Sequence, residues 1–368
     1  MARIICTVTN DLTYDQRMIR ICGSLARAGH EVLLVGRQRR ASRPLQAEPF
    51  GQERLRCCFE KGKLFYLEYN LRLFFFLLWH PFDIICAVDL DTLLPAYLTS
   101  RLRGKPCVYD AHEYFTETPE VVRRPAVQRI WAALARLIIP RLRYAYTVGP
   151  ALARIFEERY GIPFAVIRNL PARQPLPEKT APDHPRIILY QGALNEGRGL
   201  ECAIAAMQKI EGAVLWLAGE GDLSDALRQL ARQMGLEEKV RFLGFLPPRE
   251  LQQLTPQAYL GLNLLENRGL SYYYSLANKA FDYVQAGKPS IQMAFPEYTA
   301  LNAQHEVFLL LDELSANALT AAIRQLLHDA ERYEQLQANC WRAREEWVWE
   351  KEEERLLEFY KNVESAFL

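Results

Sequence analysis

The chain has 368 residues, of which 50% are hydrophobic and 24% charged, an ordinary globular composition that excludes a disordered chain. This length favours two domains over a single core. The net charge of +1 is unevenly distributed, because residues 1–175 carry 26 Lys and Arg against 16 Asp and Glu, whereas the remainder carries 19 against 28.

This asymmetry indicates that the first half faces an anionic partner. A membrane surface fits better than nucleic acid, since the basic residues stand among Leu, Ile, Trp and Phe rather than in a stacking pattern. A solvated basic face would have the same composition.

The start of the chain predicts a cytoplasmic protein. Its first residues show no signal-peptide pattern, and the longest apolar window, Leu64–Trp79, is interrupted by Glu68, Asn70 and Arg72, so we expect no membrane-spanning helix. The eight cysteines contain no CxxC motif, which fits a reducing compartment. A peripheral position on the inner face of the membrane would agree with the basic first half.

Strand and helix patterns alternate through residues 1–168. The first strand, Arg3–Val8, precedes a helical pattern that begins at Tyr14 and ends at Gly29, and Glu31–Val35 forms the next strand. Four more strands are predicted at Ile84–Val88, Cys107–Tyr109, Ala145–Val148 and Phe164–Ile167. Strands separated by helices imply a parallel sheet, and therefore a doubly wound α/β domain.

Residues 169–185 contain five prolines and little apolar periodicity, which predicts a linker. A second domain of the same class is predicted over residues 186–345. Its strands are expected at Ile187–Gln191, Val214–Ala218, Val240–Leu243, Leu260–Leu265, Ser290–Met293 and Val307–Leu311. Its helices are expected at Leu200–Lys209, Leu223–Met234, Leu276–Ala286 and Asn317–Ala338.

The acidic stretch 346–368 completes the chain as part of one long predicted helix, which should pack on other elements because Trp347 and Trp349 are too large to be exposed. The predicted architecture is thus two doubly wound, Rossmann-like α/β domains that face each other across a cleft. Ligands of such sheets bind beyond the carboxyl ends of the strands. Two facing edges would make a slot for a two-part substrate.

The stretch SLANKAFDYVQAG, from Ser275 to Gly287, contains the first candidate site. Lys279 and Asp282 are three residues apart on a predicted helix and share a face with Ser275. Free N–H groups of a first helical turn attract an anion, Lys279 adds a full charge, and the carboxylate could accept hydrogen bonds from a ribose. The pattern therefore favours a nucleotide, although a surface Lys–Asp pair is an equal alternative.

A glycine-rich turn, YQGALNEGRGLE, follows the first strand of the second domain. Gly192, Gly197 and Gly199 would let the backbone approach an anion, and Arg198 supplies a planar set of donors. The turn matches neither GxGxxG nor a P-loop. A turn with a solvated arginine is the alternative.

In the first domain, the segment YDAHEYF follows a predicted strand. It places Asp110, His112 and Glu113 at the carboxyl end of that strand, where the cleft is expected, although a single histidine can equally be structural. The start of the first helix has no glycine pair, which argues against a dinucleotide site there. Its charged residues are Asp15, Arg17 and Arg20.

Together these motifs resemble the family 4, GT-B type retaining glycosyltransferases over essentially the whole chain. The resemblance lies in NDLTYDQRMIR, LARAGHEV, YDAHE, YQGALNEGRGLE, LAGEGDL, SLANKAFDYVQAGKP and the WVWE of the final helix. It implies a C-terminal domain that holds a nucleotide sugar and an N-terminal, acceptor-side domain. It also implies that the final helix crosses back to brace the first domain, burying Trp347 and Trp349.

The resemblance also implies individual roles. Asp282 matches the second carboxylate of the family's E-x7-E pattern, which holds the donor ribose, and Arg198 and Lys279 match contacts to the diphosphate. His112 matches the histidine that meets the donor sugar near the reacting carbon, so the catalytic set is His112, Arg198 and Lys279. The expected donor-binding residues are Gly192, Arg198, Ser275, Leu276, Asn278, Lys279 and Asp282.

Two positions depart from the family pattern. Tyr274 replaces the first Glu of E-x7-E, and Glu266 is nearby but out of register. Ala193 stands where the family tends to carry an Arg. The sugar is therefore less determined than the nucleotide, and the base, expected near Gly244–Leu246, would be read by backbone contacts.

The resulting hypothesis is a retaining hexosyltransferase that uses a UDP- or GDP-linked sugar and a glycan or lipid-linked hydroxyl acceptor. No metal or other cofactor is expected. Asp89 and Asp91 have the DxD spacing of a metal motif, but this spacing is frequent by chance and is therefore weak evidence for a metal site. A nucleotide-sugar 2-epimerase of the same fold and a non-catalytic sugar-nucleotide-binding protein remain alternatives. Leu71–Trp79 and Arg123–Arg143 could rest on an anionic bilayer, unless Leu71–Trp79 is simply a buried helix.

Overall fold

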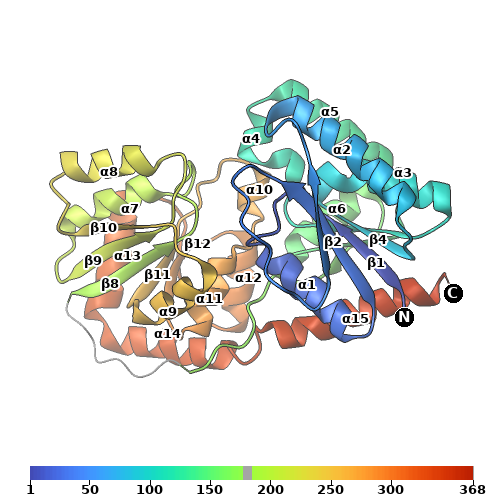
Figure 1. Cartoon of the computed structure of the whole chain (residues 1–368). Helices are drawn as coiled ribbons and strands as arrows, with labels where there is room; N and C mark the ends of the chain where they lie inside the picture. Colours follow the sequence, from blue (N-terminus) through green and yellow to red (C-terminus); the bar gives the residue numbers. More distant parts are fainter. Residues whose placement is uncertain (177–184, 368) are drawn as a thin grey trace. The chain divides into compact units, whose positions relative to one another are not determined.

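The computed structural model describes residues 1–176 and 185–367, so residues 177–184 of the predicted linker lie outside the described residues. The chain forms two compact units: Met1–Asn169 together with Lys351–Leu368, and Leu170–Glu350. Each unit contains one parallel sheet covered by helices (Figure 1). The predicted fold class of two doubly wound α/β domains is confirmed.

The first unit contains seven strands in the order β3-β2-β1-β4-β5-β6-β7. The strands are β1 Arg3–Thr7, β2 Glu31–Gln38, β3 Gly51–Arg56, β4 Ile84–Val88, β5 Cys107–Ala111, β6 Tyr144–Thr147 and β7 Ala165–Val166. The helices are α1 Gln16–Arg27, α2 Gly62–Trp79, α3 Asp89–Arg103, α4 Pro119–Val122, α5 Pro125–Ile138, α6 Pro150–Tyr160 and most of α15 Trp349–Ser365. Every position of β4 and β5 is buried, as expected for a parallel sheet with both faces covered.

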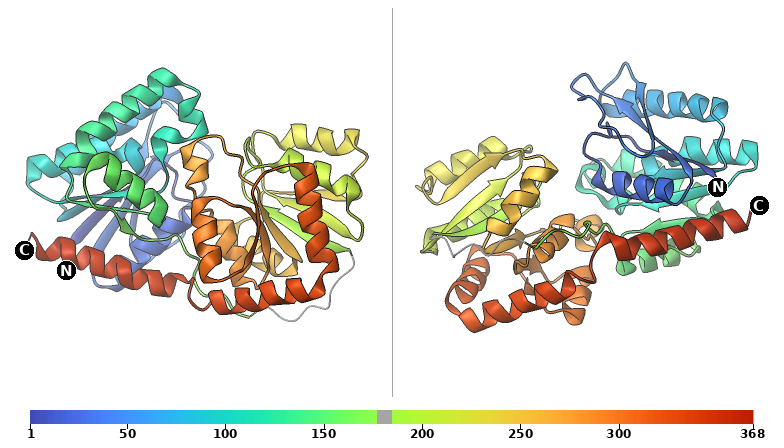
Figure 2. Two further views of the ribbon diagram at one scale, coloured as in Figure 1. Left: turned by 180° about the vertical axis from the view of Figure 1, so that it is seen from behind. Right: turned by 60° about the horizontal axis from the view of Figure 1, so that its bottom comes forward.

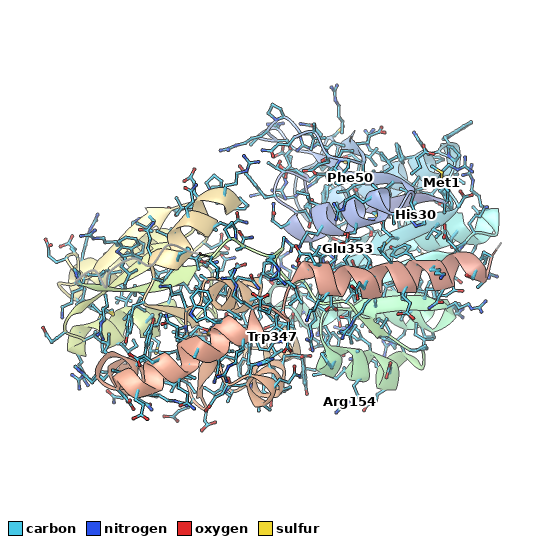
Figure 3. The ribbon with its side chains drawn as sticks, turned by 90° about the horizontal axis from the view of Figure 1, so that it is seen from below. Met1, His30, Phe50, Arg154, Trp347 and Glu353 are labelled. Carbon is cyan, nitrogen blue, oxygen red and sulfur yellow. The ribbon has the colours of Figure 1, made fainter. Side chains whose placement is uncertain are left out.

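The C-terminal helix α15 packs beside α1 in the first unit (Figures 2 and 3). Arg27 of α1 forms an ion pair with Glu353 at 2.8 Å. Further along α15, Phe359 packs edge-on against Tyr146 of β6. These contacts attach the end of the chain to the first sheet.

The second unit contains six strands in the order β10-β9-β8-β11-β12-β13. The strands are β8 Arg186–Gln191, β9 Ala213–Ala218, β10 Val240–Gly244, β11 Leu260–Asn263, β12 Ser290–Met293 and β13 Phe308–Leu311. The helices are α7 Leu200–Ala206, α8 Ser224–Gln233, α9 Pro248–Leu254, α10 Leu270–Tyr273, α11 Asn278–Gln285, α12 Pro296–Gln304, α13 Ala316–His328 and α14 Ala330–Ala343. The loops that follow parallel strands meet at one edge of a sheet, and the candidate residues of each unit lie at that edge.

The structure corrects two predicted elements. Strand β3 was not predicted, because its sequence GQERLR lacks an apolar run and pairs only with β2 at the sheet edge. The helix predicted over Asn317–Ala338 is two helices, since the chain leaves helical geometry at Asp329, whose carboxylate caps α14 by accepting from the Arg332 N–H.

Two further predictions about helix starts were wrong. The helix predicted from Leu276 begins at Asn278, and the C-terminal helix begins only at Trp349. Trp347 is buried as expected, but in the core of the second unit, where its ring packs against Phe281 and Phe308. Its burial therefore does not come from bracing the first domain.

The helix α2 has two apolar faces. No helix in the described part of the chain is long and apolar enough to cross a membrane. Phe65, Tyr69, Leu73 and Leu77 are buried, so the buried-helix alternative holds for one face only. The other face, named here the α2 stripe, is exposed and consists of Leu64, Leu67, Leu71, Phe75 and Trp79.

A buried amide links α11 to the segment that precedes α15. Gln285, 1% exposed, donates to the carbonyls of Arg344 and Trp347 at 2.8 and 3.1 Å. Gln285→Ala should lower the free energy of unfolding by about 2 kcal/mol, because two buried carbonyls lose their partner. Denaturant unfolding would measure this, with the exposed Gln252→Ala as a control expected within about 0.5 kcal/mol of wild type. Equal effects of the two substitutions would contradict the proposed link.

Candidate functional site

Lys279 lies at the first turn of α11 and is buried, with 9% of its surface exposed. Its Nζ is 3.9 Å from the centre of the Tyr190 ring and 3.1 Å from the point where a Cβ on Gly192 would stand. Burial lowers the pKa of Lys279 well below its ordinary value, and the charge of Arg198 lowers it further. The charged form of the Lys279 amine is therefore disfavoured until an anion lies beside it.

The glycine-rich turn of β8–α7 is shaped by close contacts. Gly197 and Gly199 have φ values of +79° and +66°, and a Cβ on Gly199 would lie 2.5 Å from the Leu264 carbonyl. Between them, Arg198 stacks its guanidinium over the Tyr272 ring at 4.8 Å. The Arg198 Nε is buried and has no hydrogen-bond partner among the described residues, so it remains available as a donor.

The neighbouring loop fixes the position of Gly192. Its N–H donates to the Ala218 carbonyl at 2.9 Å, and a Cβ on Gly219 would lie only 1.9 Å from the Gly192 carbonyl oxygen. Only glycine fits at position 219, where φ is +152°. The β9 loop therefore holds the turn beneath Lys279.

Asp282 lies one turn beyond Lys279 on α11. Its Oδ2 accepts a hydrogen bond from Gln191 Nε2 at 3.0 Å. The Oε1 of Gln191 in turn accepts from the Thr255 hydroxyl at 2.8 Å. The hydrogen bonds of Gln191 and Thr255 therefore fix the orientation of the Asp282 carboxylate.

The remaining predicted donor residues precede α11. Ser275 and Leu276 lie outside the helix, and the Ser275 hydroxyl donates to the Tyr272 carbonyl at 2.8 Å. Asn278 is the first helical residue, and the N–H before it, that of Ala277, donates to the Tyr298 hydroxyl at 2.9 Å. Structure thus brings Gly192, Arg198 and Lys279 together, with Asp282 on the next turn.

In the first unit, His112 lies between two aspartates at the carboxyl edge of the sheet. Its Nε2 is 3.0 Å from Asp110 Oδ2, and its main-chain N–H donates to Asp89 Oδ1 at 2.9 Å. Arg17 completes the group by pairing with the other oxygen of Asp110 at 2.9 Å. The imidazole is held in one orientation, with 21% of its side chain exposed.

Charge within this group is distributed unevenly. Asp110 is fully buried, which alone would raise its pKa, but Arg17 and His112 hold the pKa at about 2. Burial opposes the charge of His112 as well, yet Asp110 and Asp89 raise its pKa above the ordinary value. Burial raises the pKa of Asp89 to about 8 and that of Asp91 to about 6.

The DxD spacing does not bring its carboxylates to a common metal position. Asp89 faces His112, whereas Asp91 accepts from the Thr9 hydroxyl at 2.6 Å. Across residues 1–176 and 185–367, no group of three or more His, Cys, Asp or Glu is arranged to hold a metal ion. All eight cysteines are free thiols.

Sequence reasoning missed the residues that support the candidate side chains. The Tyr190 ring faces Lys279 Nζ, and Gln191 donates a hydrogen bond to Asp282. The Tyr272 ring stacks against Arg198. Tyr190 and Gln191 end a predicted strand at its carboxyl edge, which was a usable signal. Tyr272 had none, because its ring reaches Arg198 from a different loop.

Two parallel α/β units with these edges define the GT-B class of glycosyltransferase folds. Sucrose-phosphate synthase from Thermosynechococcus elongatus aligns with a TM-score of 0.81 and 17% identity over 100% of both chains. HepE from Anabaena, solved with UDP and glucose, aligns with a TM-score of 0.77 and 16% identity over 98% of this chain and 100% of its own.

The family follows from the sequence matches. Residues 15–172 match the "Glycosyl transferase 4-like domain" and residues 173–341 match "Glycosyl transferases group 1", so the chain belongs to the group 1, family 4-like glycosyltransferases. The lipopolysaccharide core biosynthesis glycosyltransferase LpsD of Rhizobium meliloti is 27% identical over 50% of this chain and 53% of its own. The match thus spans about half the length of this curated relative.

The titration of Asp89 should be visible in the pH dependence of stability. The folded protein retains this proton up to about pH 8, whereas the unfolded chain releases it near 3.8. Because the unfolded state binds fewer protons in this window, stability should fall as pH rises through it. Asp89→Asn should remove much of that fall, on the order of a few kcal/mol.

Thermal unfolding between pH 4.5 and 8.5 would measure the difference. Asparagine suits this position because residue 89 has a φ of +55°, which Asn tolerates, and because its side-chain oxygen can still accept from His112. Asp225→Asn, on a fully exposed side chain, is the control and should leave the pH dependence unchanged. A fall in stability above pH 6 that is the same in wild type and in Asp89→Asn would exclude a proton on Asp89, because Asp91, with a pKa of about 6, titrates at lower pH.

Proposed function

We propose that the protein transfers a hexose from a UDP- or GDP-linked sugar to a hydroxyl of a glycan or lipid-linked acceptor, with retention and without a metal ion. The observation that carries this proposal is the buried Lys279 beside Arg198 and Gly192. Two cations beside a glycine turn, one desolvated and one with a free donor, suit a diphosphate. The nucleotides in the HepE structures support the same class of donor.

The donor would lie with its ribose at Asp282 and its diphosphate between Arg198 and Lys279. As the glycosidic bond breaks, negative charge develops on the leaving diphosphate, and donors already in place stabilise that charge most at the transition state. Each such donor contributes about 3 kcal/mol to catalysis. The low pKa of Lys279 means that the anion also restores its charge on binding.

The acceptor hydroxyl must lose a proton when the new bond forms. In a same-face reaction the leaving phosphate oxygen can take this proton, so the proposal requires no Asp or Glu base. His112 would then position the donor sugar near the reacting carbon. Asp110, itself paired with Arg17, holds the imidazole in place and favours its charged form, whereas the charge of Arg17 opposes it.

Two other functions remain distinguishable. A nucleotide-sugar 2-epimerase of this fold would change the donor sugar without an acceptor. A non-catalytic protein would bind the nucleotide without hydrolysis or transfer, and Tyr274 in place of the family's first Glu is compatible with it.

The first experiment is a thermal-shift panel of UDP, GDP, ADP and their sugar conjugates on wild type and variants. Lys279→Met should weaken binding of the matching nucleotide about 10- to 100-fold, the usual range for a charged hydrogen bond. It should also leave the ligand-free protein at least as stable, because a buried charge is removed. Asp282→Asn should weaken the binding of nucleotides that carry a ribose hydroxyl pair more than it weakens the binding of inorganic diphosphate.

Lys288→Met is a matched control, because this half-buried lysine follows α11 and its pKa is likewise lowered by burial. It should leave nucleotide binding unchanged. If no nucleotide stabilises wild type, or if the two lysine variants lose equal affinity, the proposed donor site is wrong.

Turnover tests the reaction itself. With the matching donor and an acceptor mixture, NMR of the product should show the anomeric configuration of the donor sugar, and EDTA should leave the rate unchanged. His112→Ala should lower kcat by about 100-fold or more if the residue positions the sugar. An inverted product, an epimerised donor or near-full turnover of His112→Ala would each contradict the assignment that it tests.

A further inference from the structure

The first unit contains a pocket at the opposite end of its strands from His112. Its volume is about 230 Å³, and it lies where β5 and β6 begin, at Cys107 and Tyr144. His112 follows the other end of β5, so the pocket is not part of the site described above. Four lining residues are basic and none is acidic: Arg101, Lys105, Arg141 and Arg143.

Part of this charge is already neutralised. Lys105 pairs with Asp83 at 3.2 Å, and Arg141 donates to a main-chain carbonyl at the end of α5, a usual role for a cation at a helix C-terminus. Arg101 and Arg143 have no carboxylate within ion-pair distance in the described ranges. The pocket therefore retains positive charge for an anion from outside.

Exposed apolar side chains border the same edge. Phe367 lines the pocket and is 49% exposed, and Leu102, beside Arg101 on α3, is 69% exposed. Arg103 donates to the carbonyls of Leu78 and His80, which joins the end of α3 to the end of α2. Trp79, the last residue of the α2 stripe, is 82% exposed at this position.

The apolar surface is concentrated in one layer of the first unit. The helices α2, α3 and α5 pack side by side (Figure 1), and they contribute most of the large hydrophobic side chains exposed on the described residues: Leu64, Leu67, Leu71, Phe75, Trp79, Leu94, Leu98, Leu102, Ile130 and Leu137. Monomeric proteins rarely expose so many together unless the surface meets a partner. Apolar side chains among Lys and Arg are the chemistry of a membrane interface.

We propose that the pocket binds the phosphate of an anionic lipid headgroup while the α2 stripe and Leu102 enter the acyl boundary. The first unit would thereby dock on an anionic bilayer through Arg101 and Arg143. The inference extends the proposed function, because a lipid-linked acceptor would lie in that bilayer. Charge attraction and apolar burial act together, since either alone gives weak binding.

Vesicle flotation of the full chain tests this inference. Wild type should bind vesicles of phosphatidylcholine with one third phosphatidylglycerol, bind pure phosphatidylcholine much less, and lose binding in high salt. Arg101→Gln/Arg143→Gln should lose about tenfold or more of its binding to the anionic vesicles. The control Arg27→Gln/Arg154→Gln removes the same charge from the same unit at residues that do not line the pocket, and it should lose less than about threefold.

If the two double variants lost vesicle binding equally, general charge attraction would explain the binding without the pocket, and the proposal would be overturned. The proposal would also be overturned if wild type did not bind anionic vesicles, even if it bound inorganic phosphate. The nucleotide panel is run on the same variants and should be unchanged by either pair. A failed nucleotide response with intact pocket-dependent flotation would overturn the proposed function and leave the headgroup site standing.

Discussion

The all-parallel pairing of both sheets is the constraint on which the remaining structure depends. Parallel strands buried on both faces leave no place for polar side chains along β4, β5 or β8, except where a strand ends. The crossover helices bring all such ends to a single edge. Asp110 with His112 in one unit, and Gln191 with Gly192 in the other, stand at this carboxyl edge of their sheets.

The two edges treat charge in opposite ways. In the first unit, Arg17, Asp110 and His112 satisfy one another, so the imidazole is oriented before any ligand arrives. In the second unit, Lys279 is desolvated with an aromatic ring beneath it. A group that is held fixed suits positioning, and a charge that lacks compensation suits binding of an anion.

Sequence alone predicted the fold class and placed Arg198, Lys279 and Asp282 in the correct elements, because glycine turns and helical spacing are local properties. It could not predict that Tyr190 supports Lys279 or that Tyr272 carries Arg198, since both contacts depend on tertiary packing. The prediction missed the polar edge strand β3 and the helix break at Asp329 for a related reason. Local sequence patterns indicate which residues are buried, but they do not show which strands pair or where a side chain caps a helix. Sequence alone left open whether Leu71–Trp79 is exposed or buried, because apolar residues on a helix do not show which of its faces is covered.

The tight fit of Gly219 against the Gly192 carbonyl has a consequence for how this site can change over evolutionary time. Residue 219 is not one of the predicted donor contacts, yet any side chain there must push the turn beneath Lys279 out of position. The two loops must therefore change together, because a side chain at position 219 displaces the Gly192 carbonyl of the other loop.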